Sequence, residues 1–467
     1  MFGDRSRPEC DTFFEEVRKI AALAWPVLIA QLAFVSFGVL DTMIVGRYAT
    51  VDLAAISLGA AVNASVYMGL ASILYALQPI VGQNFGTARY RRIGELVRQA
   101  AWLAAVLMVV GALVLHYPRL ILQIADSTDE VNIRSTQYLG ILSFCLPARM
   151  VFGIFASLSN AVSKPRLPML ILVGTLIVKF LLNLWFVRGG YGLPEFGGPG
   201  AALATFVATW LSAIACITVM SRHPYYRQFA IFRRFSRPRW CHLRAMLVLG
   251  IPMALSSLIE VSSYTCMTLF IGRFGAVQLA AHQIASNLGA VLYMVPLSIA
   301  IATLTLVSQK IGANEPAAAR TLSRTGVSLA AFCAVMSSTL VMMASVVIVA
   351  AYTSDLRVAA AAMPLVQAVA FYHLADAIQL NAAFALRAYK VTMMPAIIYA
   401  VASMGIGVGG GYVAGFDVFH VMPATLIGAR GFWWAGTASL VIVAVCLLVR
   451  WRWIGLAPMG SRSLARS

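Results

Sequence analysis

Charged side chains are scarce in this sequence. Of its 467 residues only 11% are charged and 61% are hydrophobic, whereas ordinary soluble domains have roughly 25% charged residues. So few charged side chains cannot cover the surface of a soluble protein of this length. The hydrophobic residues also occur in runs of about 20 or more, which is typical of helices that cross a bilayer. The composition therefore indicates a membrane protein with many spans.

Metal-binding and catalytic sequence patterns are missing as well. The seven Cys residues form no CxxC pair, and the six His residues are scattered along the chain. Neither a disulfide framework nor a metal site built from Cys and His is therefore expected. No nucleophile with its base and no DxD-like acidic pair is found, which argues against a membrane-embedded enzyme. We expect no catalytic residues and no cofactor other than a coupling ion.

Twelve hydrophobic segments are long enough to cross a bilayer as helices. Most of the 35 Lys and Arg residues lie on one side of these segments, in the two termini and in alternate loops. The positive-inside rule places that side, and both termini, in the cytoplasm. The segments are predicted at residues 19–46, 53–83, 95–116, 132–160, 168–187, 199–220, 243–271, 279–310, 321–352, 358–386, 393–415 and 431–450.

The net charge of +18 is concentrated in these short loops. There it sets topology, so it does not indicate nucleic-acid binding. Arg far outnumbers Lys in the sequence, which is typical of GC-rich bacterial genomes and favours a bacterial inner membrane. No pattern indicates an oligomer, so we expect a monomer surrounded by the lipid bilayer.

The two halves of the chain repeat each other. Pro26 corresponds to Pro252, and Gln83 corresponds to Gln309 at the same spacing. Each half holds six segments, so both halves insert in the same orientation, as parallel repeats that suit alternating access. We predict an all-α fold of two six-helix bundles related by a pseudo-twofold axis. Residues 1–220 would form the N-terminal bundle, 221–242 a cytoplasmic inter-bundle loop, and 243–467 the C-terminal bundle with a short cytoplasmic tail.

Three acidic residues lie inside predicted spans, namely Asp41, Glu260 and Asp376. An ionised carboxylate in the bilayer is costly, so it normally faces a cavity, has a partner and serves a function. Tyr372, His373 and Gln379 share a helical face with Asp376. Such clusters could bind Na⁺ through oxygen ligands or carry a proton, although a static internal salt bridge is the alternative.

Two basic residues also lie inside spans. Lys179 precedes Asn183 by one helical turn, and both are predicted at a depth where they could meet Asp41. We predict that Lys179 pairs with Asp41, either as a static or as a moving ion pair. Arg149 occupies the repeat position of Asp376, where it could snorkel, pair at an inter-helix contact or contact substrate.

These residues occur within motifs that resemble the multidrug and toxic compound extrusion (MATE) family, and in particular its NorM-type bacterial branch. The resemblance covers nearly the whole chain. It depends on Trp25-Pro26-Val27-Leu28, Val39-Leu40-Asp41-Thr42, Ala280-Ala281-His282-Gln283, Asp376-Ala377-Ile378-Gln379 and Gly428-Ala429-Arg430-Gly431-Phe432-Trp433.

The resemblance implies a secondary active exporter that exchanges cationic, amphipathic drugs and dyes for H⁺ or Na⁺. It implies that Glu260 and Asp376 are coupling carboxylates and that Tyr372 completes a Na⁺ site with them if sodium is the coupling ion. The resemblance also implies that Asp41 takes part in cation coupling, because it matches the acidic residue whose protonation reshapes the N-terminal bundle in the family.

The same resemblance places the drug against Asp376, Gln283, Tyr293, Asp355 and Glu260. The sequence departs from the family at Lys179, where many relatives have Asn beside Asp41 and Asn183. An ammonium group there acts as a built-in cation, which argues against a Na⁺ site in the N-terminal bundle.

Other functions remain open at this point. A metabolite or lipid-linked sugar could be the cargo, since distant relatives of such a fold move these compounds. That cargo would call for more basic residues inside the spans than Arg149 and Lys179. A channel is less favoured because the sequence has a repeat and isolated acidic residues but no pore-loop motif.

Overall fold

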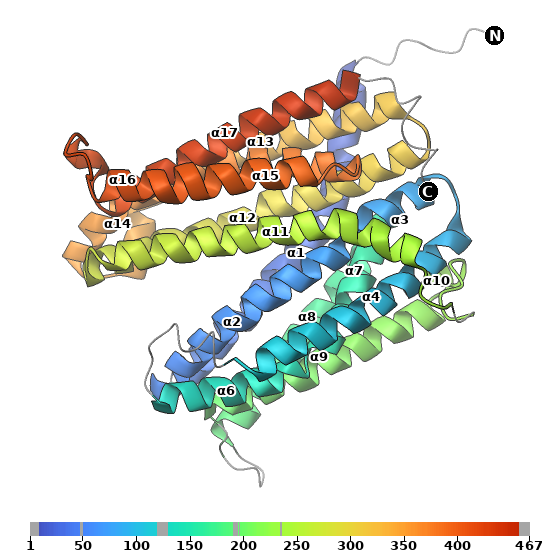
Figure 1. Cartoon of the computed structure of the whole chain (residues 1–467), viewed down its shortest axis with the longest axis horizontal. Helices are drawn as coiled ribbons and strands as arrows, with labels where there is room; N and C mark the ends of the chain where they lie inside the picture. The colour runs from blue at the N-terminus through green and yellow to red at the C-terminus, as the bar shows by residue number, and fades with distance from the viewer. Residues whose placement is uncertain are drawn as a thin grey trace. The chain divides into compact units, whose positions relative to one another are not determined.

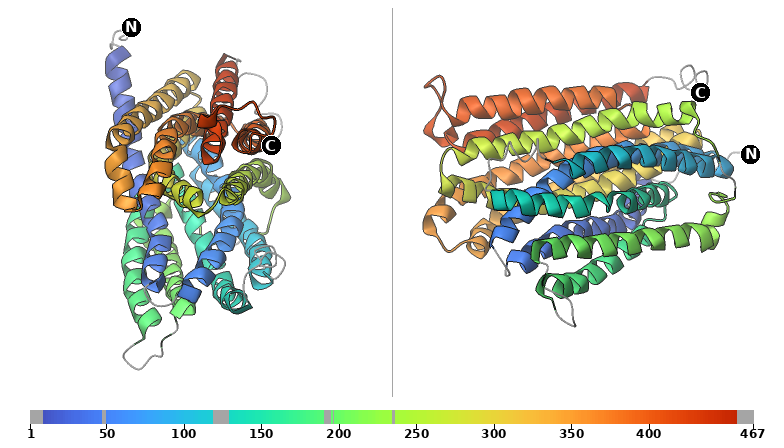
Figure 2. Two further views of the ribbon diagram at one scale, coloured as in Figure 1. Left: turned by 90° about the vertical axis from the view of Figure 1, so that its left-hand side faces the viewer. Right: turned by 60° about the horizontal axis from the view of Figure 1, so that its bottom comes forward.

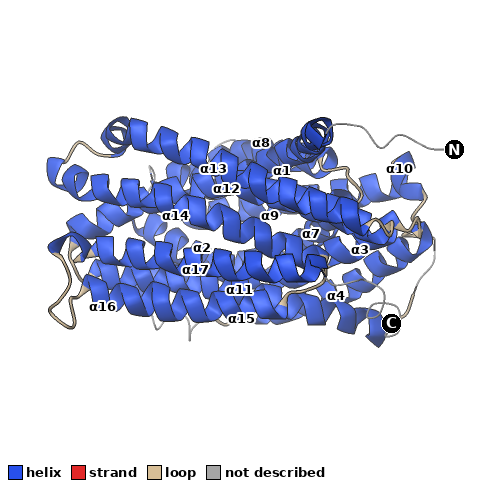
Figure 3. Cartoon of the chain, turned by 90° about the horizontal axis from the view of Figure 1, so that it is seen from above, coloured by secondary structure: helices blue, strands red, loops and turns tan. Residues whose placement is uncertain are grey.

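A computed structural model describes residues 9–46, 50–118, 129–189, 195, 197–233 and 236–456. Every regular element in these ranges is helical and none is a strand (Figure 3). Eleven helices within these ranges are long and apolar enough to cross a membrane, and the bent helix pair Val131–Ser143 and Leu146–Ala161 makes a twelfth span when it is counted as one. The all-helical fold class and the twelve predicted spans are therefore confirmed.

The helices of the first half cover the predicted segments, although the first helix begins ten residues before the predicted start at residue 19. They are α1 (Glu9–Gly46), α2 (Thr50–Tyr75), α3 (Leu77–Gly86), α4 (Tyr90–His116), α6 (Asp129–Ser143), α7 (Leu146–Ala161), α8 (Arg166–Arg188), α9 (Gly197–Arg222) and the short α10 (Pro224–Arg227). The second half contains α11 (Trp240–Gly272), α12 (Ala276–Gly312), α13 (Pro316–Tyr352), α14 (Leu356–Ala388), α15 (Met393–Val401), a π-helical segment (Ala402–Gly410), α16 (Gly411–Gly415) and α17 (Ala429–Leu456).

Two spans of the first half are not the continuous helices that the sequence predicted. The span predicted at 53–83 is divided at Ala76 into α2 and α3. The span predicted at 132–160 is divided into α6 and α7, which meet at an angle of 49°. Pro147 lies in the first turn of α7, where its missing N–H and its ring prevent the preceding helix from continuing.

A π-helical segment interrupts the span predicted at 393–415. It covers Ala402–Gly410 and is rich in glycine. The segment packs on α17, and so does the neighbouring α16. A Cβ atom on Gly411 would lie 2.7 Å from Cδ1 of Phe432, so this approach requires glycine. π-Helical turns are rare and are frequently found at functional sites.

The chain divides into two compact units (Figure 1). One contains Met1–Leu28 and Leu255–Ser467, and the other is Ile29–Ala254. Both boundaries fall two residues after a proline inside a long helix, Pro26 of α1 and Pro252 of α11. The bundles predicted from the repeat at 1–220 and 243–467 stay a prediction.

Within each unit the long helices run side by side (Figure 2). In the unit that contains the C-terminal half, α14 packs against α12, α13 and α17. In the Ile29–Ala254 unit the largest apolar core joins α2, α3, α4 and α7 to the chain after α10, with Phe155, Tyr226 and Phe229 fully buried in it. Because α14 packs against three other helices of this unit, its residue Asp376 lies in the interior of the unit.

Candidate functional site

Asp376 lies on the central helix α14 and is buried, with 8% of its surface exposed. One of its carboxylate oxygens, Oδ1, accepts a hydrogen bond of 3.0 Å from Nε2 of Gln379. Gln379 was predicted to share this face, and it does. His373 differs from that prediction, because its Nε2 lies 3.0 Å from the Ser337 hydroxyl of α13. The imidazole of His373 therefore links α14 to α13 and does not hydrogen-bond to the Asp376 carboxylate.

The carboxylate of Glu260 on α11 lies within electrostatic range of Asp376. Tyr293 on α12 and Tyr372 on α14 are electrostatic neighbours of both carboxylates. Tyr372 also packs edge-on against Trp433 of α17, with 5.4 Å between the ring centroids. The structure thus brings four predicted site residues from three helices together in one unit.

Arg387 and Tyr399 belong to the same cluster, although the sequence analysis did not select them. Arg387 is an electrostatic neighbour of Glu260 and Tyr293, and its guanidinium carbon lies 4.2 Å from the centroid of the Phe384 ring. Tyr399 on α15 is an electrostatic neighbour of Glu260 and Tyr293 as well. A basic residue therefore lies among the acidic residues of this site.

The position of Arg387 could have been anticipated from spacing. It follows Asp376 by 11 residues, which is about three helical turns and returns to the same face. The predicted span ended at residue 386 and left Arg387 in a loop, whereas α14 continues to Ala388.

Asp355 and Gln283 form their hydrogen bonds with residues outside the carboxylate cluster. Asp355 is the N-cap of α14 and accepts a hydrogen bond of 2.8 Å from the backbone N–H of Arg357. It precedes Asp376 by 21 residues, or about 32 Å of helix. Gln283 is exposed on α12 and donates to Asn287 at 3.3 Å. Their drug-binding role stays a prediction.

The Ile29–Ala254 unit contains a second polar cluster, formed by Asp41 on α1 with Lys179 and Asn183 on α8. Nζ of Lys179 lies 2.8 Å from Oδ2 of Asp41, and Nδ2 of Asn183 donates to Oδ1 of Asp41 at 2.7 Å. Lys179 also donates to the carbonyl oxygen of Phe37 at 3.2 Å. All three polar side chains are buried. The predicted pairing of Lys179 with Asp41 is confirmed.

This second cluster is electrically neutral without a bound ion. Both carboxylate oxygens of Asp41 already accept hydrogen bonds, and the ammonium group of Lys179 occupies the place where a cation would be held. Separating Asp41 from Lys179 would leave a buried charge without a partner, which is energetically costly. Arg149, the other basic residue inside a predicted span, lies over the ring of Tyr67 at 5.2 Å.

Binding of Na⁺ to either cluster would need further oxygen ligands in addition to the carboxylates. Among the described residues no group of three or more His, Cys, Asp and Glu side chains could hold a metal ion. The Glu260–Asp376 cluster offers two carboxylates and the phenol oxygens of Tyr293 and Tyr372. Carboxylate, hydroxyl and carbonyl oxygens suit hard cations, so this donor set fits Na⁺ and fits a proton equally.

Twelve apolar spans, an internal repeat and acidic residues inside the spans define a polytopic membrane transport protein. The MatE family model matches residues 26–185 and 252–413. The chain belongs to the MatE family, and it is a transporter and not an enzyme. The two matched segments begin at Pro26 and Pro252, which confirms the predicted repeat.

Named relatives support this assignment over most of the chain. The sequence is 37% identical to a "Probable multidrug resistance protein NorM" of Aromatoleum aromaticum, over 90% of this chain and 91% of the relative. It is 33% identical to a protein of the same name from Neisseria meningitidis, over 96% of each. The crystal structure of a eukaryotic MATE transporter has the same fold, with a TM-score of 0.85 over 96% of this chain and 97% of that one, at 19% identity.

Proposed function

We propose that this protein exports cationic, amphipathic drugs in exchange for H⁺ or Na⁺ by alternating access. The observation that carries the proposal is the proximity of Glu260 and Asp376 within the membrane-spanning part of one unit. Repulsion between two carboxylates favours a bound cation, and Tyr293 and Tyr372 add aromatic faces that attract organic cations. The names of the NorM relatives agree with a multidrug cargo.

We expect the coupling ion to bind at the Glu260–Asp376 cluster and not at Asp41, because the Asp41 cluster already contains a positive charge. Lys179 already neutralises Asp41, so an incoming cation would have to displace a covalently held ammonium group. Glu260 has no such ion pair with a described residue and is exposed at the surface of α11. The coupling ion therefore exchanges at Glu260 and Asp376, with Tyr372 as a third ligand if the ion is Na⁺.

The proposed setting is the inner membrane of a bacterium, with a monomeric protein and both termini in the cytoplasm. The exposed arginines of the 221–242 segment support this orientation through the positive-inside rule. Drug would then leave on the opposite side.

Export of an anionic metabolite or a lipid-linked sugar is the second candidate. Arg387 favours it, because the site contains a basic residue that the sequence analysis had placed in a loop. With Arg387, Arg149 and Lys179, the spans contain as many basic residues as acidic ones (Asp41, Glu260 and Asp376).

The test is efflux of a fluorescent organic cation from proteoliposomes under a pH gradient or a Na⁺ gradient imposed separately. Wild type is compared with Glu260→Gln and Asp376→Asn, and with Glu315→Gln as a control, since Glu315 pairs with Lys310 at a surface turn. We expect one gradient to drive efflux, both site variants to abolish it and the control to retain it. If no gradient moves the dye, the drug proposal fails and anionic cargo becomes the leading candidate.

A further inference from the structure

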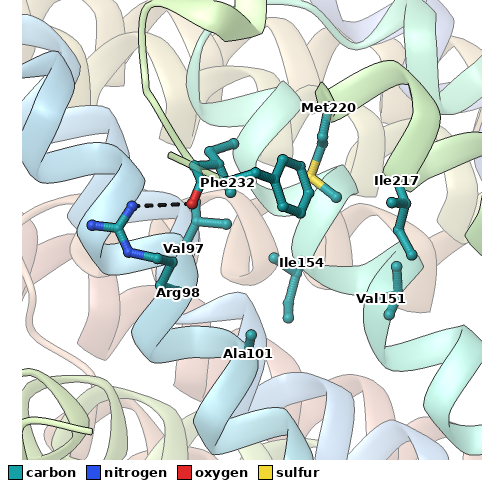
Figure 4. A pocket seen from close by; sticks show the side chains of 9 residues that line it. Val97, Arg98, Ala101, Val151, Ile154, Ile217, Met220 and Phe232 are labelled. Atoms are coloured by element: carbon teal, nitrogen blue, oxygen red, sulfur yellow. Dashed lines mark hydrogen bonds between the residues drawn. The ribbon is translucent and has the colours of Figure 1, made fainter. Parts of the chain in front are cut away.

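A cavity of about 380 Å³ opens between α4, α7 and α9, beneath the chain that follows α10 (Figure 4). This volume is within the range of small-molecule sites, about 300–1,000 Å³. Every side chain that lines the cavity is apolar except that of Arg98. The lining residues are Val97, Arg98, Ala101, Val151, Ile154, Ile217, Met220, Ile231 and Phe232.

Arg98 holds the covering chain in place at one end of the cavity. Its Nε donates to the Ser236 hydroxyl at 3.0 Å, and its Nη1 donates to the carbonyl oxygens of Ala230 and Ile231, both at 3.1 Å. The dashed line in Figure 4 marks one of these hydrogen bonds of Arg98. Arg98 forms no ion pair with a described acidic residue, so its positive charge stays uncompensated beside an apolar cavity.

The position of Trp102 indicates the depth of the cavity in the membrane. This residue is one turn beyond Arg98, and its Nε1 donates to the Ser236 carbonyl oxygen at 3.0 Å. Tryptophan favours the level of the lipid headgroups. Farther along α4, Val106 and Val109 are exposed apolar residues that suit lipid contact. The cavity therefore lies where the headgroup region meets the hydrocarbon.

The surface around the cavity is strongly basic. Within 84–118 and 221–242 the sequence contains a single acidic residue, Glu95, and it pairs with Arg239 at 2.7 Å. The exposed arginines of this surface are Arg89, Arg91, Arg92, Arg222, Arg227, Arg233, Arg237 and Arg239. Basic clusters at the end of a membrane helix attract anionic lipid headgroups.

We propose that this cavity binds one acyl chain of an anionic phospholipid and that Arg98, Arg233 and Arg237 hold its phosphate group. The apolar lining suits a hydrocarbon chain. The positive charge of Arg98, which has no ion pair within the described part of the chain, suits an anionic headgroup, and Trp102 indicates that Arg98 lies at headgroup depth. The placement in the cytoplasmic leaflet depends on the orientation proposed above, whereas lipid binding itself does not depend on transport. The bound lipid would join α4, α7 and α9 to the covering chain.

The test is native mass spectrometry of the delipidated full-length protein with phosphatidylglycerol or with phosphatidylcholine of the same acyl chains. We expect one phosphatidylglycerol to bind more tightly than the rest and more tightly than phosphatidylcholine. Ala101→Phe fills the cavity and should abolish this tight binding. Val106→Phe adds the same ring on the same helix outside the cavity and should retain it.

A second variant separates lipid recognition from a folding defect. Arg233→Gln with Arg237→Gln changes two exposed residues and should weaken phosphatidylglycerol binding by about fivefold per arginine. Phosphatidylcholine binding should weaken less, because the choline cation of that lipid offsets the charge of its phosphate group. Equal binding of the two lipids, or unchanged binding in Ala101→Phe, would overturn the proposal. Displacement of the lipid by a transported dye at this cavity would also overturn it, since the occupant would then be a drug. Loss of dye efflux with lipid binding intact would count against the transport proposal alone.

Discussion

Asp41 and Lys179 form a buried ion pair, with 2.8 Å between Oδ2 and Nζ and with 8% and 2% of their side chains exposed. Asn183 satisfies the other carboxylate oxygen, so the carboxylate is held from both sides. Replacing one member of a buried ion pair strongly destabilises a protein, because the other charge stays buried without a partner. Replacing both members costs far less stability.

Replacement of Lys179 by Met should therefore destabilise the protein by about 3–5 kcal/mol, because it leaves the Asp41 carboxylate buried without a counter-ion. Asp41→Asn in the same chain should recover part of this loss. The measurement is the free energy of unfolding in detergent for wild type, the two single variants and the double variant. A double variant no more stable than Lys179→Met would contradict a direct interaction between the two groups.

Lys179→Asn should change the pH dependence of transport. The substitution removes the built-in cation, so Asp41 becomes free to exchange an ion. The measurement is the initial rate of dye efflux across a range of pH values in proteoliposomes. An unchanged profile with normal efflux would mean that the pair is purely structural.

Arg387→Gln should increase the affinity of the carboxylate cluster for its coupling ion by about tenfold. A positive charge near Glu260 competes with the incoming cation, and a unit charge a few ångströms away contributes energies of this order in a protein. The measurement is the concentration of H⁺ or Na⁺ that half-saturates efflux.

Arg273→Gln provides the matched control for Arg387. The Arg273 guanidinium also lies over a phenylalanine ring, that of Phe270 at 5.6 Å, but it is exposed and outside the cluster. An equal shift in both variants would show that the effect is one of overall charge.

Tyr226→Phe should reduce the loss of stability in alkaline solution. Burial raises the pKa of Tyr226 from 10.0 to about 12, so the neutral phenol stabilises the folded chain fully below pH 10. That stabilisation is lost as the pH rises from about 10 to about 12, because only the unfolded chain then ionises. Two pKa units correspond to about 3 kcal/mol. Thermal unfolding at pH 9 and pH 11.5 should differ less in the variant than in wild type.

The spans and the second polar cluster could be predicted because each depends on local chemistry. Long apolar runs must form helices in lipid. A buried Lys needs a carboxylate partner at the same depth in the membrane, and for Lys179 this requirement predicted Asp41. The breaks in the spans were harder to predict. Pro147 indicates one of them. The four glycines within Ala402–Gly410 indicate a weak helix there, but they do not predict that its turns are π-helical.

The cluster around Glu260 was predicted in part. Glu260, Asp376, Tyr293 and Tyr372 were identified from acidic residues in apolar runs and from the family resemblance. Arg387 was missed because a basic residue near a predicted helix end is normally assigned to the loop. The direction of His373 toward Ser337 depends on which helix packs beside α14, and one sequence does not contain that information.

The division of α1 and α11 has a consequence for how the chain can be cut. Ile20 and Ala24 pack with the C-terminal unit, whereas Met246 and Met253 pack in the core of the Ile29–Ala254 unit. The 221–242 segment therefore lies inside one unit, and a protease that nicks it would not release either unit. Two fragments made by splitting the gene there would each begin with part of a helix, from α1 or from α11, that packs in the core formed mainly by the other fragment. Each fragment would therefore need its counterpart to complete its own core.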